Sequence, residues 1–294
     1  MPRVRVVRGR ARGTGAGPRA ALAGTLALAA ACAHGPVDGP SARPSLEAAI
    51  AAPDARIAWV GAHPDDETSV GAILARACRH HGRPCLIVAL TDGGGGACDR
   101  AEPCFPDVAS VRRAELAEAA RRLHADHVVG PYPNAPLPWS SFPRRDHQAA
   151  RWRAAGGDPV VFVERTLAAF APTVVLTFGP TYGFTGHPEH QLAARITRAA
   201  VARLRARPAV WTVLNRHPLA RLFGRGDPEV ELERFDATSP CGSPARSCLD
   251  VALAVTRTHA TQSRDMGLVR ALRPQLGTIY LGALEGDEAW DEAP

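Results

Sequence analysis

The sequence contains no lysine, and it has no acidic residue before residue 32. All 35 basic residues are therefore arginines, and six of them lie in that acid-free N-terminal segment. The rest of the chain carries 29 arginines and 29 acidic residues, so the formal charge of +6 comes from the N-terminus. This balance argues against a basic domain that binds nucleic acid through its charge.

Long apolar runs and internal repeats are also absent. The alanine- and leucine-rich stretch at 20–31 is shorter than the ~20 apolar residues that a membrane-spanning helix needs. With 46% hydrophobic and 22% charged residues, the composition is typical of a soluble globular protein. A length of 294 residues suits one large domain or two small ones.

The N-terminus has the charged and apolar regions of a secretory signal. Small residues precede Cys32, as in bacterial lipoprotein signals, where such a cysteine becomes the acylated N-terminus. Cleavage after Ala33 and an unexported Ala-rich tail are the alternatives. We expect residues 1–32 to be a signal peptide, with Cys32 as a candidate lipidation site. The chain would then be exported to the bacterial cell envelope, the periplasm or the medium, and touch the membrane only through such a lipid anchor.

The other six cysteines fall into three close pairs, Cys78 with Cys85, Cys98 with Cys104, and Cys241 with Cys248. An even number of cysteines in an exported chain indicates disulfides, and sequential pairing is favoured because each pair closes a short loop. The spacings differ from those of C-x-x-C zinc and redox sites. Six buried thiols are the alternative.

Hydrophobic periodicity predicts a parallel α/β fold. Residues 33–53 are rich in Pro, Gly and Ala, as in a linker, so we expect the domain at 54–294. Strands are predicted at 57–60, 85–90, 126–130, 173–178 and 209–214, with an extra edge strand within 229–236. Helical spacing at 70–77, 116–123, 159–170 and 188–206 alternates with them, 249–273 forms one or two closing helices, and 131–157 is a long connection.

Two polar motifs follow predicted strands. His63-Pro64-Asp65-Asp66 comes directly after the first strand, and His187-Pro188-Glu189-His190 follows the strand at 173–178. Ligands of open α/β sheets bind at the carboxyl ends of strands. We therefore expect one metal site formed by His63, Asp66 and either His187 or His190, since three N/O ligands plus water are typical of catalytic zinc. Helix caps and surface imidazoles are the alternatives.

These residues resemble the motifs of the PIG-L/LmbE-like de-N-acetylases over roughly residues 55–265. The resemblance implies a Rossmann-like open, mostly parallel sheet with helices on both faces in a single domain. It implies Zn²⁺ as cofactor, although such a site accepts other divalent ions. His63, Asp66 and His190 would be the metal ligands, Asp65 the general base, and His187 the group that stabilises the oxyanion.

Weaker similarities extend to the substrate site. Asp92 lies in a T-x-G turn, Arg112 in an R-x-x-E helix with Glu115, and His259 in an H-x-[ST]-Q motif that ends at Gln262. Glu189 replaces the commoner Asp and would still orient a neighbouring histidine.

Two further positions depart from the family pattern. Gly94 replaces a Glu that touches the sugar in many members. Thr185 stands where some members have a proton-donating Tyr, so that role is either absent or taken by Tyr182 from the same loop.

The expected function is that of a zinc-dependent amidohydrolase that removes an N-acetyl group from an N-acetylglucosamine-type sugar or glycoconjugate. The expected partner is that substrate and not nucleic acid. One alternative is a non-catalytic carbohydrate- or metal-binding relic of the same fold. Another is a deacylase of N-acyl amino compounds.

Overall fold

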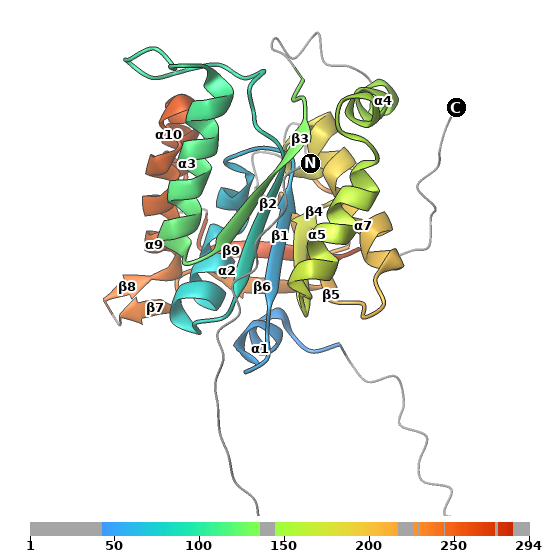
Figure 1. The fold of residues 1–294 in the computed structure, drawn as a ribbon. Coiled ribbons are helices and arrows are strands. Elements are labelled where there is room, and N and C mark those ends of the chain that lie inside the picture. The colour runs from blue at the N-terminus through green and yellow to red at the C-terminus, as the bar shows by residue number, and fades with distance from the viewer. Residues whose placement is uncertain are drawn as a thin grey trace, which may run out of the picture. The chain divides into compact units, whose positions relative to one another are not determined.

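The centre of the molecule is a sheet of seven strands within the described residues, in the order β3-β2-β1-β4-β5-β9-β6 (Figure 1). This computed structural model describes residues 43–135, 145–216, 226–228, 230–243, 245–273 and 276–284. They belong to one compact unit that begins at Arg43. The strands are β1 (Ile57–Gly61), β2 (Cys85–Thr91), β3 (Asp126–Tyr132), β4 (Val174–Phe178), β5 (Ala209–Leu214), β6 (Glu233–Asp236) and β9 (Thr278–Ala283).

Strands β1 to β5 are parallel, and they confirm the five strands predicted from the apolar runs. Every residue of β1, β2 and β4 is buried, because helices cover both faces of a parallel sheet. Strand β9 pairs antiparallel with β5, and β6 pairs antiparallel with β9 at the edge, within the range predicted for an edge strand. The fold is therefore the mostly parallel α/β architecture that we expected.

Helices lie on both faces of the sheet (Figure 1). One face carries α1 (Leu46–Ala51), α2 (Gly71–Leu74), α3 (Val108–Leu123), α9 (Cys248–Val255) and α10 (Ser263–Ala271). The other carries α4 (Arg145–Gly156), α5 (Pro159–Phe170) and α7 (Pro188–Arg203). The described residues also form short helical segments: η1 (Asp66–Val70), η2 (Ala75–His80), α6 (Gly183–Gly186), η4 (Thr256–Thr258) and η5 (Ala260–Gln262).

Two helices lie where the sequence indicated irregular chain. Helix α1 falls within the expected linker, yet Leu46 and Ile50 are fully buried, so the packed unit begins before residue 54. Helix α4 falls within the connection at 131–157 and buries Gln148, Ala149 and Trp152. Prediction of a helix from sequence depends on a repeated spacing of apolar residues. Helix α1 is too short to show that spacing, and in α4 a polar residue interrupts it on the buried face.

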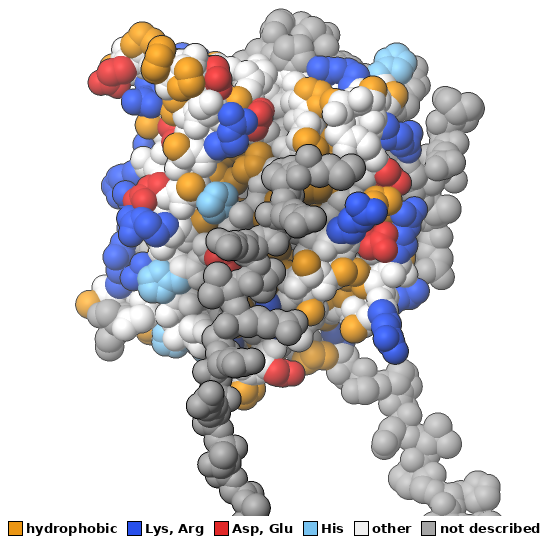
Figure 2. Space-filling view, viewed as in Figure 1, with side chains coloured by type: hydrophobic (Ala, Val, Ile, Leu, Met, Phe, Trp, Pro, Cys, Tyr) orange, Lys and Arg blue, Asp and Glu red, His pale blue; other side chains and the backbone are white. Residues whose placement is uncertain are grey.

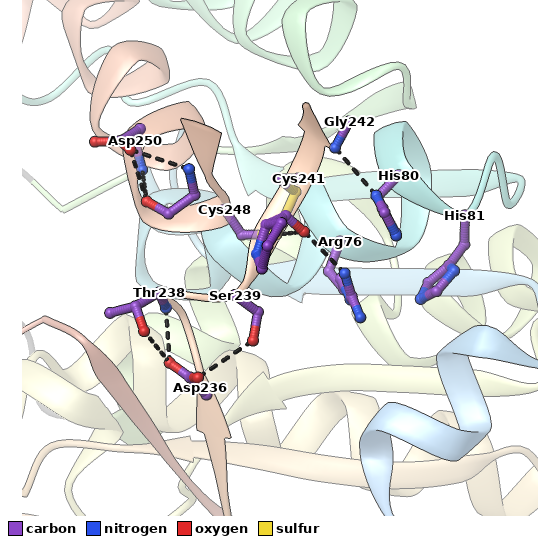
Figure 3. The surroundings of a disulfide bond; sticks show 12 residues. Arg76, His80, His81, Asp236, Thr238, Ser239, Cys241, Gly242, Cys248 and Asp250 are labelled. Atoms are coloured by element: carbon purple, nitrogen blue, oxygen red, sulfur yellow. Dashed lines mark hydrogen bonds between the residues drawn. A yellow bond between two sulfur atoms is a disulfide. The ribbon is translucent and has the colours of Figure 1, made fainter. Parts of the chain in front are cut away.

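All three sequential disulfides are formed, as predicted. The bond Cys241–Cys248 joins the hairpin of β7 (Pro240–Ser243) and β8 (Arg246–Ser247) to the start of α9 (Figure 3). The side chain of Arg76 donates to the Pro240 carbonyl at 2.8 Å, so the same hairpin is also attached to η2. Cys32 and the predicted signal peptide lie outside the described residues.

The surface has no strong segregation of charge on the face drawn in Figure 2, where arginine side chains alternate with acidic ones among the described residues. This pattern agrees with the equal numbers of arginine and acidic residues after residue 32. Within the described ranges, no helix combines the length and the hydropathy needed to cross a membrane.

Candidate active site

The two polar motifs meet at the carboxyl ends of β1 and β4. The first motif begins at His63, two residues after Gly61, which ends β1. In the second, His187 caps the N-terminus of α7, where its Nδ1 accepts a hydrogen bond from the Glu189 N–H at 3.1 Å, and Pro188 occupies the first helical turn. His63 and His190, 127 residues apart in the chain, thus share one buried centre, as the position of both motifs at strand ends predicted.

Three donor atoms converge in this centre. The Nδ1 atom of His63 and the Nε2 atom of His190 are 3.2 Å apart, and His190 Nε2 is 3.0 Å from Asp66 Oδ1. All three side chains are buried. Ligand atoms that are 2.0–2.1 Å from a tetrahedral zinc ion lie about 3.3 Å from one another, so this spacing fits such an ion.

The remaining polar atoms of the same three residues are held by the protein. His63 Nε2 donates to Glu189 Oε2 at 2.7 Å, and His190 Nδ1 donates to the Gly183 carbonyl at 3.0 Å. Asp66 Oδ2 accepts from the N–H groups of Ala62 and His63, which leaves Oδ1 to face the histidines. Metal-binding histidines usually donate their second N–H to a carboxylate or carbonyl, and both histidines here do so.

The charges of the centre also favour a cation. Burial opposes the charged form of His63, but the carboxylates of Asp66 and Glu189 outweigh burial and raise the pKa of the imidazole to about 10. Burial likewise opposes charge on Asp66, yet His190 and His63 hold the pKa of its carboxyl well below the usual range. The same negative surroundings that retain a proton on His63 would attract a divalent ion in its place.

A second group of donors, formed by His63, His187 and Glu189, is also close enough to hold a metal. Glu189, however, is already saturated. Its Oε1 accepts from the Ala135 N–H at 2.9 Å and from Gln148 Nε2, and its Oε2 accepts from His63. The geometry therefore favours His63, Asp66 and His190 as ligands, and it places Glu189 where it orients the His63 ring.

Asp65 lies beside these ligands in an unusual backbone conformation, with φ of 119°. Its N–H donates to Glu67 Oε2 at 3.1 Å, and its Oδ2 accepts from Gln262 Nε2. Burial and the neighbouring Asp66 carboxylate raise the pKa of Asp65 to about 7. A carboxylate with such a pKa is suited to accept a proton near neutral pH.

His187 packs edge-on against His63 and parallel to His190, with ring centroids 4.7 and 4.8 Å apart. Burial and the two neighbouring histidines lower the pKa of His187, so its ring is neutral near pH 7. Because its Nδ1 accepts the Glu189 N–H, the neutral ring carries its hydrogen on Nε2. His187 is therefore a hydrogen-bond donor beside the candidate metal ligands.

A cavity of about 650 Å³ opens onto this centre, and Asp65, His187 and Arg112 all line it. The buried Arg112 donates to the Ala97 carbonyl at 3.0 Å within the cavity wall. Thr185 lines the cavity as well, whereas Tyr182, the alternative proton donor, is outside its lining.

Two residues that we expected to bind substrate lie outside the cavity lining. Asp92 pairs instead with Arg113 at 2.7 Å and accepts from the Gly94 N–H. His259 is fully buried, and its Nε2 is 2.6 Å from Glu67 Oε1, so it reaches the site only through Glu67. Short motifs predicted that Asp92 and His259 lie near the site. Such motifs do not specify the direction in which a side chain points.

Several residues of the site received no role from the sequence. Gln148 and Asn134 hold Glu189, Gln262 holds Asp65, and Phe178 stacks on His190 with centroids 4.3 Å apart. Asn134 and Phe178 lie at the carboxyl ends of β3 and β4, so the same strand-end rule that identified His63 could have found them. Gln148 lies on the helix α4 that the sequence did not predict.

Residues 58–201 match the family described as PIG-L, GlcNAc-PI de-N-acetylase. A 1D-myo-inositol 2-acetamido-2-deoxy-alpha-D-glucopyranoside deacetylase of Mycobacterium sp. (strain KMS) is 30% identical over 241 residues, which cover 70% of this chain and 74% of the relative.

Solved structures share the fold. The 4-carboxy-2-hydroxymuconate hydratase GalB of Pseudomonas putida matches with a TM-score of 0.54 and 16% identity, over 79% of this chain and 97% of GalB. The N,N'-diacetylchitobiose deacetylase of Pyrococcus horikoshii matches with a TM-score of 0.51 and 15% identity, over 78% and 82% of the two chains. A hydratase and a deacetylase on one fold show that the fold alone does not determine the chemistry. The similarity in sequence is more specific than the similarity in fold. It shows that this chain belongs to the PIG-L family of de-N-acetylases, enzymes that hydrolyse amide bonds.

Proposed function

We propose that this protein is a zinc-dependent amidohydrolase that removes an N-acetyl or other N-acyl group from an N-acetylglucosamine-type sugar or glycoconjugate. The observation that carries the proposal is the convergence of His63, Asp66 and His190 beside Asp65 in one cavity. The deacetylase relative, which is named for an acetamido sugar substrate, supports the substrate class.

In this proposal, His63, Asp66 and His190 would hold a divalent ion, which when bound would lower the pKa of water and polarise the amide carbonyl. Asp65 acts as the general base, accepting the proton of the attacking water. Gln262 holds one oxygen of that carboxylate and Glu67 holds the backbone N–H, so the base stays in place while the substrate binds. Positioned acid-base catalysis of this kind contributes about 10² to 10⁴ in rate.

His187 stabilises the tetrahedral intermediate. Its neutral ring presents a donor at Nε2, and a preorganised donor to a developing oxyanion contributes about 3–4 kcal/mol to catalysis. As the C–N bond breaks, the proton taken by Asp65 passes to the departing nitrogen, so that the products are the free amino sugar and the carboxylate of the acyl group.

Release of amine from a panel of N-acetylated sugars and N-acyl amino acids by the zinc-loaded protein tests this function. We expect Asp65→Asn to lower kcat/KM by at least about 100-fold and to leave zinc content unchanged. Asp54→Asn is the matched control, because Asp54 is exposed and precedes β1 at the opposite end of that strand. Normal activity in Asp65→Asn would refute its role as the base, and no amine release from any acetylated sugar would refute the substrate class.

We also propose that residues 1–32 direct export and that Cys32 is acylated. Three disulfides support an oxidising compartment, because such bonds persist in the periplasm and outside the cell. The mass of the mature N-terminus from a bacterial host tests this proposal. A diacylglyceryl group on Cys32 is the expected result, and a chain that begins after Ala33 without lipid would contradict it.

A further inference from the structure

The cavity extends well beyond the polar groups of the active site. Its polar end contains Asp65, Arg112 and Asn134, near the ends of β1 and β3. From there it continues between the sheet and the helices of one face. Strands β5 and β9 contribute Leu214 and Ile279 to one wall, and α9 and α10 contribute Leu253 and Val269 to the other.

The apolar wall begins at a candidate metal ligand. The ring of Phe178 stacks on that of His190 at an interplanar angle of 11°, and it also contacts Phe184 at a centroid distance of 6.3 Å. Both phenylalanines line the same cavity. An acyl chain on a carbonyl at the metal ligands would therefore lie next to these two rings, with Thr185 and Asn215 beside them in the lining.

The part of the cavity beside α10 and β9 is less suited to a second sugar than the end beside Asp65. Among the described residues that α9, α10 and β9 contribute to its lining, most are aliphatic or aromatic. The hydroxyl of Thr256 is already used, since it donates to the Leu253 carbonyl at 2.8 Å and accepts from Arg270 at 3.2 Å. The other polar residues of this part are Asp265, Thr278, Tyr280, Asn215 and Arg216. It thus offers fewer polar groups to replace the water around sugar hydroxyls than the end beside Asp65 does.

The size of the cavity also exceeds what an acetyl group needs. Protein interiors are close-packed, and apolar cavities tend to stay dry and to bind apolar molecules. The volume of about 650 Å³ includes the polar end, where the sugar would lie, and the largely apolar part, where an acyl chain would lie. It lies within the range of pockets that hold drug-sized ligands.

We propose that the largely apolar part of this cavity, between β5, β9, α9 and α10, binds the acyl chain of the substrate, and that the enzyme prefers medium-length aliphatic N-acyl groups over acetyl. This inference rests on the proposed amidohydrolase function and specifies its substrate. The amide bond separates a polar amino sugar from its acyl chain, and the cavity has the same division, with polar groups at one end and apolar side chains at the other.

A series of N-acyl glucosamines from acetyl to decanoyl tests the proposal with the zinc-loaded protein. Each buried methylene should raise kcat/KM by about fourfold until the cavity is full, which predicts at least a 100-fold gain from acetyl to octanoyl. Alkyl glycosides of N-acetylglucosamine form the second arm. A gain in that arm alone would assign the cavity to the aglycone and overturn the proposal, as would a fall in kcat/KM with acyl length.

Val269→Trp provides a variant that narrows the apolar part from α10. It should reduce the ratio of kcat/KM for octanoyl to kcat/KM for acetyl by at least about 10-fold, because less of a long chain can be buried. Val230→Trp is the matched control, because Val230 is 76% exposed and lies outside the cavity lining. An unchanged octanoyl preference in a folded Val269→Trp protein would overturn the proposal, and the parent chain-length series decides the question if that variant does not fold.

Binding separates this inference from the proposed function. Calorimetry of the same acyl series with zinc-loaded Asp65→Asn measures affinity without turnover. Affinity that rises with acyl length, in the absence of any hydrolysis by the parent protein, would refute the amidohydrolase function and retain the acyl cavity. Affinity that is independent of length would refute the cavity assignment, whatever the activity.

Discussion

At two residues of the site, Asp65 and Glu189, the surrounding structure fixes the conformation or the hydrogen bonds of a single side chain. Asp65 has φ of 119°, outside the regions that residues with a Cβ normally occupy. The contact of its N–H with Glu67 maintains this conformation. Such positions cost about 1–3 kcal/mol and persist where the surrounding structure enforces them. Glu189 shows the opposite case, since it accepts from four donors, two of them from the segment after β3, and its remaining role is to orient His63.

The strain at Asp65 predicts a difference in stability between two inactive variants of this residue. Asp65→Gly and Asp65→Ala both remove the carboxylate, so both should abolish activity. Glycine accepts a positive φ without a Cβ clash, and Asp65→Gly should therefore be about 1–2 kcal/mol more stable than Asp65→Ala. Urea unfolding of the zinc-loaded proteins measures the difference. Equal stabilities would show that the backbone of Asp65 is not strained.

Glu189→Gln tests the orientation of His63. The amide weakens the hydrogen bond from His63 Nε2, and partners of metal-binding histidines typically change metal affinity by 10–100-fold. We expect a zinc affinity lower by that factor, measured by competition with a chelator. Glu164→Gln on α5 is the control, since the side chain of Glu164 is one-third exposed and pairs loosely with Arg203 at 3.8 Å. An unaffected zinc affinity in Glu189→Gln would contradict the role.

At the scale of elements, the C-terminal turn η5 and its neighbours hold the first motif in place. His259 contacts Glu67, Gln262 contacts Asp65, and Thr261 donates through both N–H and hydroxyl to Glu115 on α3. Residues that the sequence suggested as separate weak similarities are thus one network that connects α3, η1 and η5. In the proposed mechanism this network supports Asp65, and Arg112 is the member of these motifs that lines the cavity.

The His259–Glu67 pair predicts a pH dependence of stability. Burial lowers the pKa of His259, but the Glu67 carboxylate outweighs this effect and raises the pKa above 6.5. The stabilisation by the pair is therefore complete below pH 6.5 and is lost as the pH rises through the folded-state pKa. His259→Gln should cost about 3 kcal/mol at pH 6 and less at alkaline pH. Chemical denaturation across this range measures both proteins, and a cost that grows with pH would contradict the assignment.

At the scale of the whole molecule, the three disulfides each close a loop of six or seven residues, and none bridges the sheet. Closing so short a loop contributes about 2 kcal/mol in the chain-entropy model. The Cys241→Ser/Cys248→Ser double variant should therefore lose about 2 kcal/mol of unfolding free energy. A Cys78→Ser/Cys85→Ser variant should lose a similar amount. Denaturant unfolding measures both, and no loss in either would show that these bonds do not stabilise the fold.

The sequence by itself determined the features that depend on neighbours in the chain. Five parallel strands follow from short apolar runs between helical segments, and the disulfide pairs follow from close spacing. The position of the site follows from polar residues at strand ends, because all parallel strands present those ends at one edge. Each of these inferences uses a local pattern and one general rule of topology.

Only the tertiary structure decided what depends on distant parts of the chain. It distinguished His190 from His187 as a metal ligand candidate, since that choice depends on what holds each ring nitrogen. It separated Arg112, which lines the cavity, from Asp92 and His259, which do not. It also placed β9 antiparallel beside β5 and formed the apolar cavity between these strands and α10. Packing of segments far apart in sequence creates such features, and no periodicity within one segment encodes them.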